Sequence, residues 1–238
     1  NYLREVGVGN LEYDKYLKGY KPTAAFTPQV TAGLADEYLH LMARNNELMN
    51  VFESLALNVS NVEVLTVPVR DVRPDVLRPI MQAARQCKRL EVDYVSINNP
   101  DREGRIIVPH TLVYTGLRWH VRAWCEKNQG YRDFVLSRFR DEPEIMDESA
   151  HGVEGDSEWN TEVTIRLTPD PRLSPAQREV VEVDYGMHHG ALEITTRGKL
   201  VPYALKLLHV DPKEEQDDPT AQQIIVENRQ ELETWLFG

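Results

Sequence analysis

The stretch that decides the fold reads RWHVRAW and runs from Arg118 to Trp124. Apolar and ionisable side chains alternate along it, which is typical of a β-strand, because successive side chains of a strand point to opposite faces. The alternation defines two faces: Trp119, Val121 and Ala123 on one, and Arg118, His120 and Arg122 on the other. We expect the first face in a core. The second face predicts a ligand site, because three cationic or ionisable side chains repel one another unless an anion lies opposite.

The segments around this stretch also have strand character. Four strands are expected, at Leu90–Ile97, Arg105–Thr115, Arg118–Lys127 and Arg132–Phe139. Residues typical of turns separate them. Short strands at this spacing predict a small curled antiparallel sheet or barrel.

The N-terminal part has a different pattern. A hairpin is expected over Val6–Tyr20 with Gly9-Asn10 in its turn, then a helix over about 33–50 and a strand at Val62–Val69. A second helix begins at Pro74, since Pro favours the first helical turn. Its expected buried face consists of Leu77, Met81, Ala84 and Cys87.

The C-terminal part is expected to be a separate α+β unit after an acidic linker at Asp141–Trp159. The expected strands are Thr161–Leu167, Leu192–Thr196 and Gln222–Val226. Three helices are expected. The first begins at a capping box, Ser174-Pro175-Ala176-Gln177, and ends at Val183. The second covers Val201–Leu208, and the third runs from an N-cap at Asn228 to Phe237.

Composition limits the class of protein. The chain has 238 residues, 41% of them hydrophobic and 27% charged, as in ordinary globular proteins. No apolar run approaches a membrane span, no secretory signal opens the chain, and the two cysteines, Cys87 and Cys125, are isolated. We therefore expect a cytoplasmic protein without a membrane segment, a disulfide framework or a cysteine zinc site. The chain starts abruptly without Met, so we expect that upstream sequence is missing.

The net charge of −11 is unevenly divided. Residues 1–88 hold 10 basic and 10 acidic side chains, residues 89–140 hold 9 and 6, and residues 141–238 hold 8 and 22. The middle of the chain is therefore cationic, at +3, whereas the last part carries −14. An acidic chain argues against nonspecific coating of nucleic acid, but the middle could hold an anion locally.

Four elements of the middle segment together resemble the WYL domain of bacterial transcriptional regulators. They are LEVDYVS at 90–96, RIIVPH at 105–110, GLRWHVRA at 116–123 and FVLSRF at 134–139. The Trp-Tyr-Leu triplet that names the domain reads Trp119-His120-Val121 in this chain.

The resemblance extends to both sides and implies an architecture. Residues around Asn10–Tyr20 resemble the wing of a winged helix-turn-helix, and the region after Trp159 resembles the dimerising C-terminal extension of regulators of BREX and CBASS phage-defence operons. The implied domains are a wing remnant at 1–25, a linker helix region at 26–60, an Sm-like (SH3-like) small β-barrel WYL domain at 61–147 and an α+β dimerisation domain at 158–238.

The resemblance also implies a ligand-binding set for an anionic effector, such as a nucleotide or a nucleic-acid fragment. Its members are Tyr94, Ser96, Arg105, His110, Arg118, His120, Arg122 and Arg138. Arg suits this role because its planar fork binds phosphate bidentately. The alternative is a structural face paired with carboxylates such as Glu91 or Asp93. On the ligand hypothesis, Arg122→Ala should leave folding intact.

The expected function is a dimeric, ligand-responsive transcriptional regulator, most simply a repressor, that binds operator DNA through a winged head largely absent from this chain. The sequence shows no P-loop, nucleophile elbow or zinc-protease motif, so we expect neither catalysis nor a metal or other cofactor. Two alternatives remain open: a stand-alone module that binds single-stranded nucleic acid, and a protein-interaction scaffold.

Overall fold

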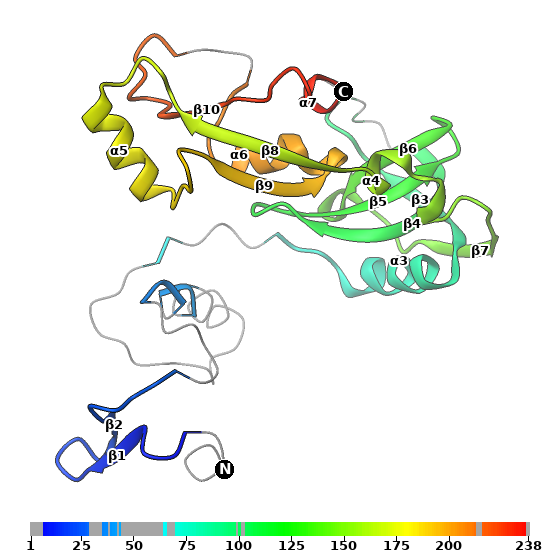
Figure 1. Ribbon diagram of the computed structural model, residues 1–238. Coiled ribbons are helices and arrows are strands. Elements are labelled where there is room, and N and C mark those ends of the chain that lie inside the picture. The colour runs from blue at the N-terminus through cyan, green and yellow to red at the C-terminus, as the bar shows by residue number, and fades with distance from the viewer. Residues whose placement is uncertain are drawn as a thin grey trace. The chain divides into compact units, whose positions relative to one another are not determined.

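The computed structural model describes residues 7–28, 35–37, 39–41, 43, 64, 65, 70–98, 100, 103–212 and 216–236. The chain divides into two compact units, Asn1–Pro68 and Val69–Gly238, and each is described by itself (Figure 1). The helix expected over 33–50 and the strand expected at Val62–Val69 lie partly outside the described residues. Residues 35–37, 39–41 and 43 are helical, whereas residues 64 and 65 are not in a strand.

The first unit contains the expected hairpin. Its strands are β1 (Leu11–Asp14) and β2 (Gly19–Pro22). The turn expected at Gly9-Asn10 was wrong, because the strands connect beyond Asp14. The Asp14 carboxylate accepts hydrogen bonds from the backbone N–H groups of Tyr16 (2.8 Å) and Leu17 (3.1 Å), and such local bonds favour a turn.

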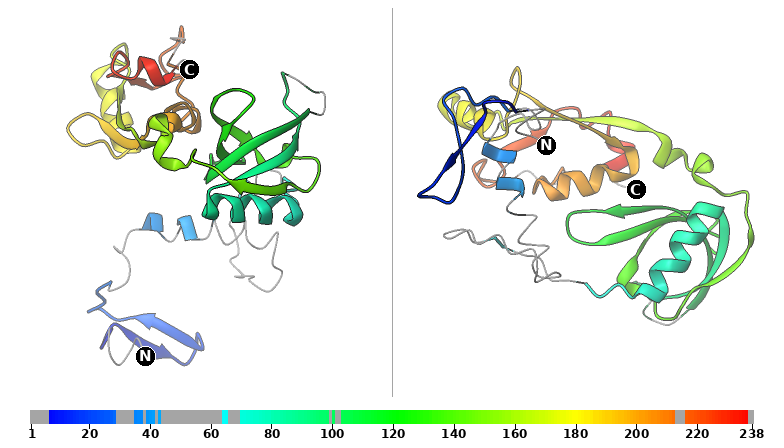
Figure 2. Two further views of the ribbon diagram at one scale, coloured as in Figure 1. Left: turned by 90° about the vertical axis from the view of Figure 1, so that its right-hand side faces the viewer. Right: turned by 90° about the horizontal axis from the view of Figure 1, so that it is seen from below.

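The second unit begins with helix α3 (Pro74–Gln86), which covers one face of a five-stranded antiparallel sheet (Figure 2). The strands are β3 (Lys88–Tyr94), β4 (Glu103–Tyr114), β5 (Trp119–Cys125), β6 (Gly130–Val135) and β7 (Glu144–Glu148). Their order is β6-β5-β4-β3-β7. The four expected strands are thus confirmed, and β7 is an addition from the stretch expected to be a linker.

The expected closed barrel is not confirmed. Within the described residues, β6 and β7 form the two ends of the sheet and do not pair with each other. After β6 the chain enters a short 3-10 helix, η2 (Leu136–Arg138), and only an isolated bridge joins Phe139 to Tyr94. The chain therefore leaves the ladder before β6 can meet the opposite edge.

Helix α3 packs on the sheet through Val76, Ile80 and Ala83, which are at most 1% exposed. The expected buried set, Leu77, Met81, Ala84 and Cys87, is only half-buried, although Leu77 packs against the same core, so the expected centre of the face was one residue too far along the helix. Both sets follow helical spacing, so the sequence pattern defines an apolar stripe but not its centre.

A second core forms around a three-stranded antiparallel sheet with the order β10-β8-β9. Its elements are β8 (Glu162–Pro169), α5 (Pro175–Asp184), β9 (Leu192–Arg197), η4 (Gly198–Leu200), α6 (Val201–Leu207), β10 (Ile224–Val226) and α7 (Glu233–Leu236). The α+β class is confirmed, as is the capping box of Ser174 and Gln177. Asn228 was expected to cap the last helix but instead bonds the backbone of Thr164 and Arg166.

The described residues contain neither a membrane-spanning helix nor a metal-binding cluster. No helix there is long and apolar enough to cross a membrane. No group of three or more His, Cys, Asp or Glu side chains in the described ranges could hold a metal ion.

Candidate functional site

Strand β5 is buried on both faces. The side toward α3 carries Val121, Ala123 and Cys125. On the other side His120 is 7% exposed and Arg122 is fully buried. The predicted alternation is therefore confirmed, but the predicted position of Trp119 was wrong. Trp119 was expected in the core and is 47% exposed, because it lies at the turn end of the β4–β5 hairpin, where it pairs with Tyr114 and the two rings contact at a centroid distance of 5.1 Å.

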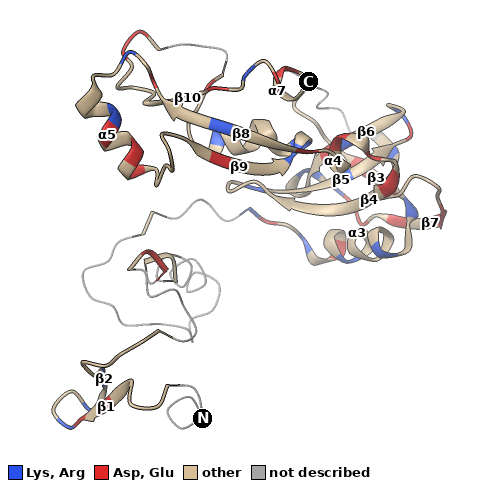
Figure 3. Ribbon diagram, in the orientation of Figure 1, with Lys and Arg blue, Asp and Glu red and all other residues tan. Residues whose placement is uncertain are grey.

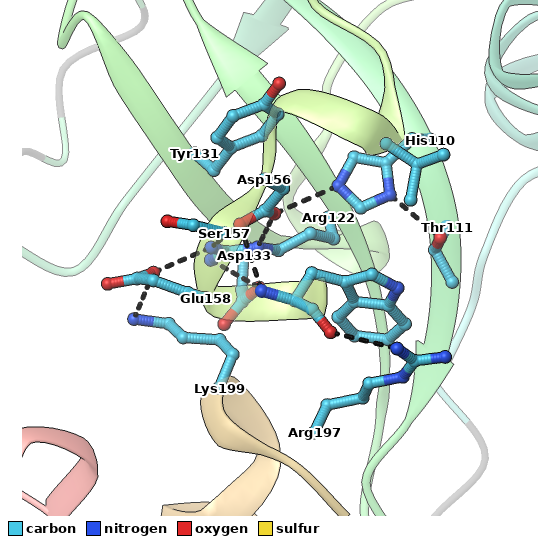
Figure 4. A network of polar contacts seen from close by, with 12 residues as sticks. His110, Thr111, Arg122, Tyr131, Asp133, Asp156, Ser157, Glu158, Arg197 and Lys199 are labelled. Carbon is cyan, nitrogen blue, oxygen red and sulfur yellow. Dashed lines mark hydrogen bonds and ion pairs between the residues drawn. The ribbon is translucent and has the colours of Figure 1, made fainter. Parts of the chain in front are cut away.

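Three carboxylates surround the buried guanidinium of Arg122 (Figure 4). Its Nε and Nη2 donate to the two carboxylate oxygens of Asp156, at 2.7 and 3.0 Å. Nη2 also donates to Glu158 at 2.7 Å, and Nη1 donates to Asp133 at 3.3 Å. All three nitrogens of the Arg side chain thus donate to carboxylates.

Asp156 is the centre of the network and is 1% exposed. It lies between two short helices, η3 (Val153–Gly155) and α4 (Ser157–Asn160), and it caps α4 by accepting the backbone N–H of Trp159 at 3.1 Å. An Asp at this position satisfies a free helical N–H group. One side chain therefore both starts α4 and holds it against β5.

His110 reaches Asp156 from a bulge in β4. Opposite β5, Pro109 pairs with Ala123 and Thr111 pairs with Arg122, which leaves His110 as an extra residue. Bulges re-aim side chains. The His110 Nε2 lies 3.1 Å from Asp156 Oδ2, and its Nδ1 lies 2.8 Å from the Thr111 hydroxyl.

Burial and charge fix the protonation states of this cluster. Burial acts to raise the pKa of Asp156, but the hydrogen bonds and charge of Arg122 outweigh it and hold the pKa below its usual value. Burial lowers the pKa of His110 despite the opposing effect of Asp156. At neutral pH the cluster therefore holds an ionised Asp156 and a neutral His110.

The network continues into the α6 region. The Tyr203 hydroxyl, on α6, donates to Asp133 Oδ2 at 3.1 Å, and Lys199, on η4, lies 3.6 Å from Glu158. Arg197, at the end of β9, donates to the backbone oxygen of Trp159 at 3.3 Å. The Arg122 network thus joins the five-stranded sheet to the three-stranded unit.

The balance of charge around Arg122 is negative. Arg122 and Lys199 contribute two positive charges, and Asp133, Asp156 and Glu158 contribute three negative ones. Figure 3 marks the acidic residues at α4 beside the sheet. An external anion would meet a site whose cation already has carboxylate partners.

The other residues of the predicted ligand set fall into two further groups. Burial lowers the pKa of His120, and the charges of Arg118 and Arg138 act in the same direction. Tyr94 belongs to the core cluster, and Arg105 lies over its ring with 5.4 Å between the guanidinium carbon and the centroid. Ser96 is half-buried just beyond β3. The structure thus brings His110 and Arg122 together and holds them through Asp156, separately from the group around His120.

Sequence reasoning missed the partners of Arg122. The expected partners were Glu91 or Asp93, whereas the observed ones are Asp133, Asp156 and Glu158. Asp133 could have been predicted from the turn after β5, because this turn sets the register of β6 and places Asp133 opposite Arg122. No local pattern links Asp156 to Arg122, 34 residues away.

Comparison with known proteins finds three family models in sequence order. Residues 1–44 match the winged helix-turn-helix domain of the BrxR transcriptional regulator, residues 75–142 the WYL domain, and residues 162–232 the BrxR C-terminal dimerization domain. A relative from Stenotrophomonas maltophilia, named DNA-binding transcriptional repressor CapW, is 34% identical over 230 residues, which is 95% of this chain and 76% of the relative. The chain belongs to this family of WYL-domain transcriptional regulators.

Two further relatives carry the same name. The CapW repressor of Pseudomonas aeruginosa is 32% identical over 94% of this chain and 75% of its own length. The CapW repressor of Escherichia coli is 33% identical with the same two shares, 94% and 75%. The family consists of regulators and not of enzymes, in agreement with the sequence.

The family matches locate the Arg122 network. Arg122 and Asp133 lie within the WYL match, and Lys199 and Tyr203 lie within the dimerization-domain match. Asp156 and its helix α4 occupy the segment between the two matches. The network is therefore the polar connection between the WYL domain and the dimerization domain.

Arg122→Ala should unfold far more easily than the wild type, contrary to the expectation from the sequence. Removing one partner of a buried ion pair costs about 3–5 kcal/mol, because the remaining charges stay buried without compensation. Urea denaturation measures the loss. Arg132→Ala is the matched control: Arg132 is exposed on β6, makes no ion pair among the described residues, and should change stability by less than about 0.5 kcal/mol. Equal stability of the two variants would contradict the structural role of Arg122.

The folded protein should lose stability as the pH falls. The pKa of His110 is lowered by folding, so the unfolded chain takes up a proton first below about pH 6.5, and stability is lost from there downward. Asp156, also with a lowered pKa, contributes stability above about pH 3.9 that is lost as the pH falls through its folded value. Denaturation at about pH 7.5 and 5.5 should show a smaller loss for His110→Gln than for the wild type. An identical loss would mean that His110 does not contribute.

Proposed function

We propose that this chain is a homodimeric, DNA-binding transcriptional repressor of a phage-defence operon, acting in the cytoplasm and controlled by an anionic effector in its WYL domain. The order of the three family matches carries the proposal, because it combines a DNA-binding head, a WYL domain and a dimerization domain in one chain. The relatives named as repressors align with at least 94% of the chain.

The β1–β2 hairpin supports the DNA-binding part. It lies within the winged helix-turn-helix match and exposes Lys15 and Lys18 in its turn. Lysines of this kind suit contacts with phosphates, which position a protein on the duplex without reading its sequence. Exposed apolar side chains in the C-terminal match support a dimer, namely Val180, Val183 and Leu207, which are 59%, 76% and 63% exposed.

The group around His120 supports the effector site. Arg118 and Arg138 both lie close to His120, and neither forms an ion pair with any described residue. This contrasts with Arg122, whose charge is neutralised within the chain. The carboxylate of this group, Asp133, is already bonded to Arg122 and Tyr203. Two arginines without an ion-pair partner among the described residues favour an anionic ligand, because a phosphate group accepts hydrogen bonds from arginine. The roles of Tyr94, Ser96, Arg105, His110 and Arg122 as direct ligands stay predictions.

The same group borders the dimerization domain, which suggests how the effector acts. The His120 ring contacts the ring of Tyr203, on α6, with centroids 5.3 Å apart. An anion that binds better to one arrangement of α6 against the WYL sheet shifts the population toward that arrangement. In a dimer this shift changes the spacing of the two heads, and half-site spacing governs operator affinity.

DNA binding is tested by selecting duplexes from random sequence with the full gene product and measuring affinity by fluorescence anisotropy at fixed salt. We expect a two-fold symmetric site. Lys15→Ala with Lys18→Ala should weaken all duplexes about equally and reduce the salt dependence of binding by about two charges. A failure to enrich any duplex would contradict the repressor proposal. Equal binding to single strands and duplexes would favour the stand-alone nucleic-acid module.

Effector binding is tested with pentathymidylate as the anionic probe. Arg118→Ala and Arg138→Ala should each weaken binding by roughly ten- to a hundredfold, since a hydrogen bond to a charged group contributes about 1.5–3 kcal/mol. Calorimetry measures the affinity, and melting curves check folding. Arg132→Ala, exposed on the same sheet, is the control and should bind as the wild type does. Unchanged affinity in both test variants would contradict this site.

A further inference from the structure

His120 is the polar side chain of β5 that the Arg122 network does not use. Its residue is 7% exposed, and within the described part of the chain neither ring nitrogen has a hydrogen-bond partner. Leaving two buried polar atoms unsatisfied is costly, and a native protein rarely does so without a reason. A ligand that hydrogen-bonds the ring would supply such a reason.

Four charged or titratable groups surround His120, whereas the neighbouring strand β4 pairs with it through Val113. The four groups are Arg118 before β5, Asp133 on β6, Arg138 on η2 and Tyr203 on α6. Asp133 is already bonded to Arg122 and Tyr203. The two arginines therefore leave an excess of positive charge toward the ring.

This environment keeps the ring neutral while no anion is bound. Burial lowers the pKa of His120, and Asp133, which opposes this, is countered by Arg118 and Arg138. A neutral imidazole has one N–H donor and one acceptor nitrogen, whereas the protonated ring has two donors. Only the protonated form could offer both nitrogens to anionic partners.

We propose that His120 is itself a ligand of the anionic effector, and that the effector binds together with a proton that His120 takes up from water. The inference rests on the proposed effector site and specifies its chemistry. An anion beside Arg118 and Arg138 cancels their repulsion of a charged ring, so protonation becomes favourable when the anion binds. The only bond that forms is the second N–H bond of the ring; solvent or buffer supplies its proton and takes it back when the anion leaves.

The identity of this residue provides a matched variant. His120 occupies the Tyr position of the Trp-Tyr-Leu triplet that names the domain. A Tyr hydroxyl can donate to an anion but has an ordinary pKa of about 10, so it does not titrate near neutrality. His120→Tyr therefore keeps a ring and a donor while removing the titration. His120→Gln is a second variant that cannot titrate, in case the larger ring disturbs packing against Tyr203.

The experiment titrates pentathymidylate lacking terminal phosphates into the protein between about pH 6 and 8. Its phosphodiesters do not titrate in this range, unlike a terminal phosphate with a second pKa near 6. Repeating the calorimetry at one pH in buffers of different ionisation enthalpy counts the protons taken up. We expect proton uptake and an affinity that rises as the pH falls, by up to about tenfold per pH unit for one proton.

The variants decide which group takes up the proton. The pH dependence and the proton uptake should disappear in His120→Tyr and His120→Gln and persist in His188→Gln, where an exposed His is replaced. Probe binding that is independent of pH, or a pH dependence retained in both His120 variants, would overturn this inference and leave the effector site standing. A complete absence of probe binding by the wild type would overturn the effector site and this inference together.

Discussion

The guanidinium of Arg122 has no exposed surface, and the arrangement around it follows from the need to neutralise its charge. Taking such an ion out of water costs several kcal/mol, which only close and well-oriented carboxylates can offset. Asp133 on the neighbouring strand accepts a hydrogen bond from Nη1, whereas Nε and Nη2 donate to Asp156 and Glu158, which η3 and α4 bring against the sheet. The position of the connecting segment is thereby tied to one residue of β5.

On the face of β5 away from α3, the charges are therefore arranged differently around Arg122 and around His120, two residues apart. At Arg122 the cation is neutralised by the chain itself, and the result is a structural joint between two domains. At His120 the neighbouring cations Arg118 and Arg138 have no such ion-pair partners among the described residues, and this is where we propose that an external anion binds. Asp133 and Tyr203 border both regions, so a ligand at one bears on the contacts of the other.

Short-range patterns in the sequence predicted much of this structure. Alternation gave β5 and its two faces, and the capping box gave the start of α5. Sequence patterns failed where an element or an ion pair depends on contacts between residues far apart in the chain. Strand β7 was taken for linker because its acidic sequence lacks a strand pattern, and it forms by pairing with β3 at the sheet edge. Asp156 was missed because nothing local reports which of many acidic residues meets Arg122.

The bulge in β4 has a consequence for chain length. In an antiparallel pair, residues directly opposite share a face. Before the bulge Pro109 lies opposite Ala123, and after it Leu112 lies opposite Val121, so both halves of β4 face the core in phase with β5. His110 is the one residue outside this ladder. A deletion of that single position would leave a regular strand, and all remaining side chains of β4 would stay on their present faces. Loss of this one residue is therefore compatible with the sheet, and it would remove only the His110 side chain that contacts Asp156.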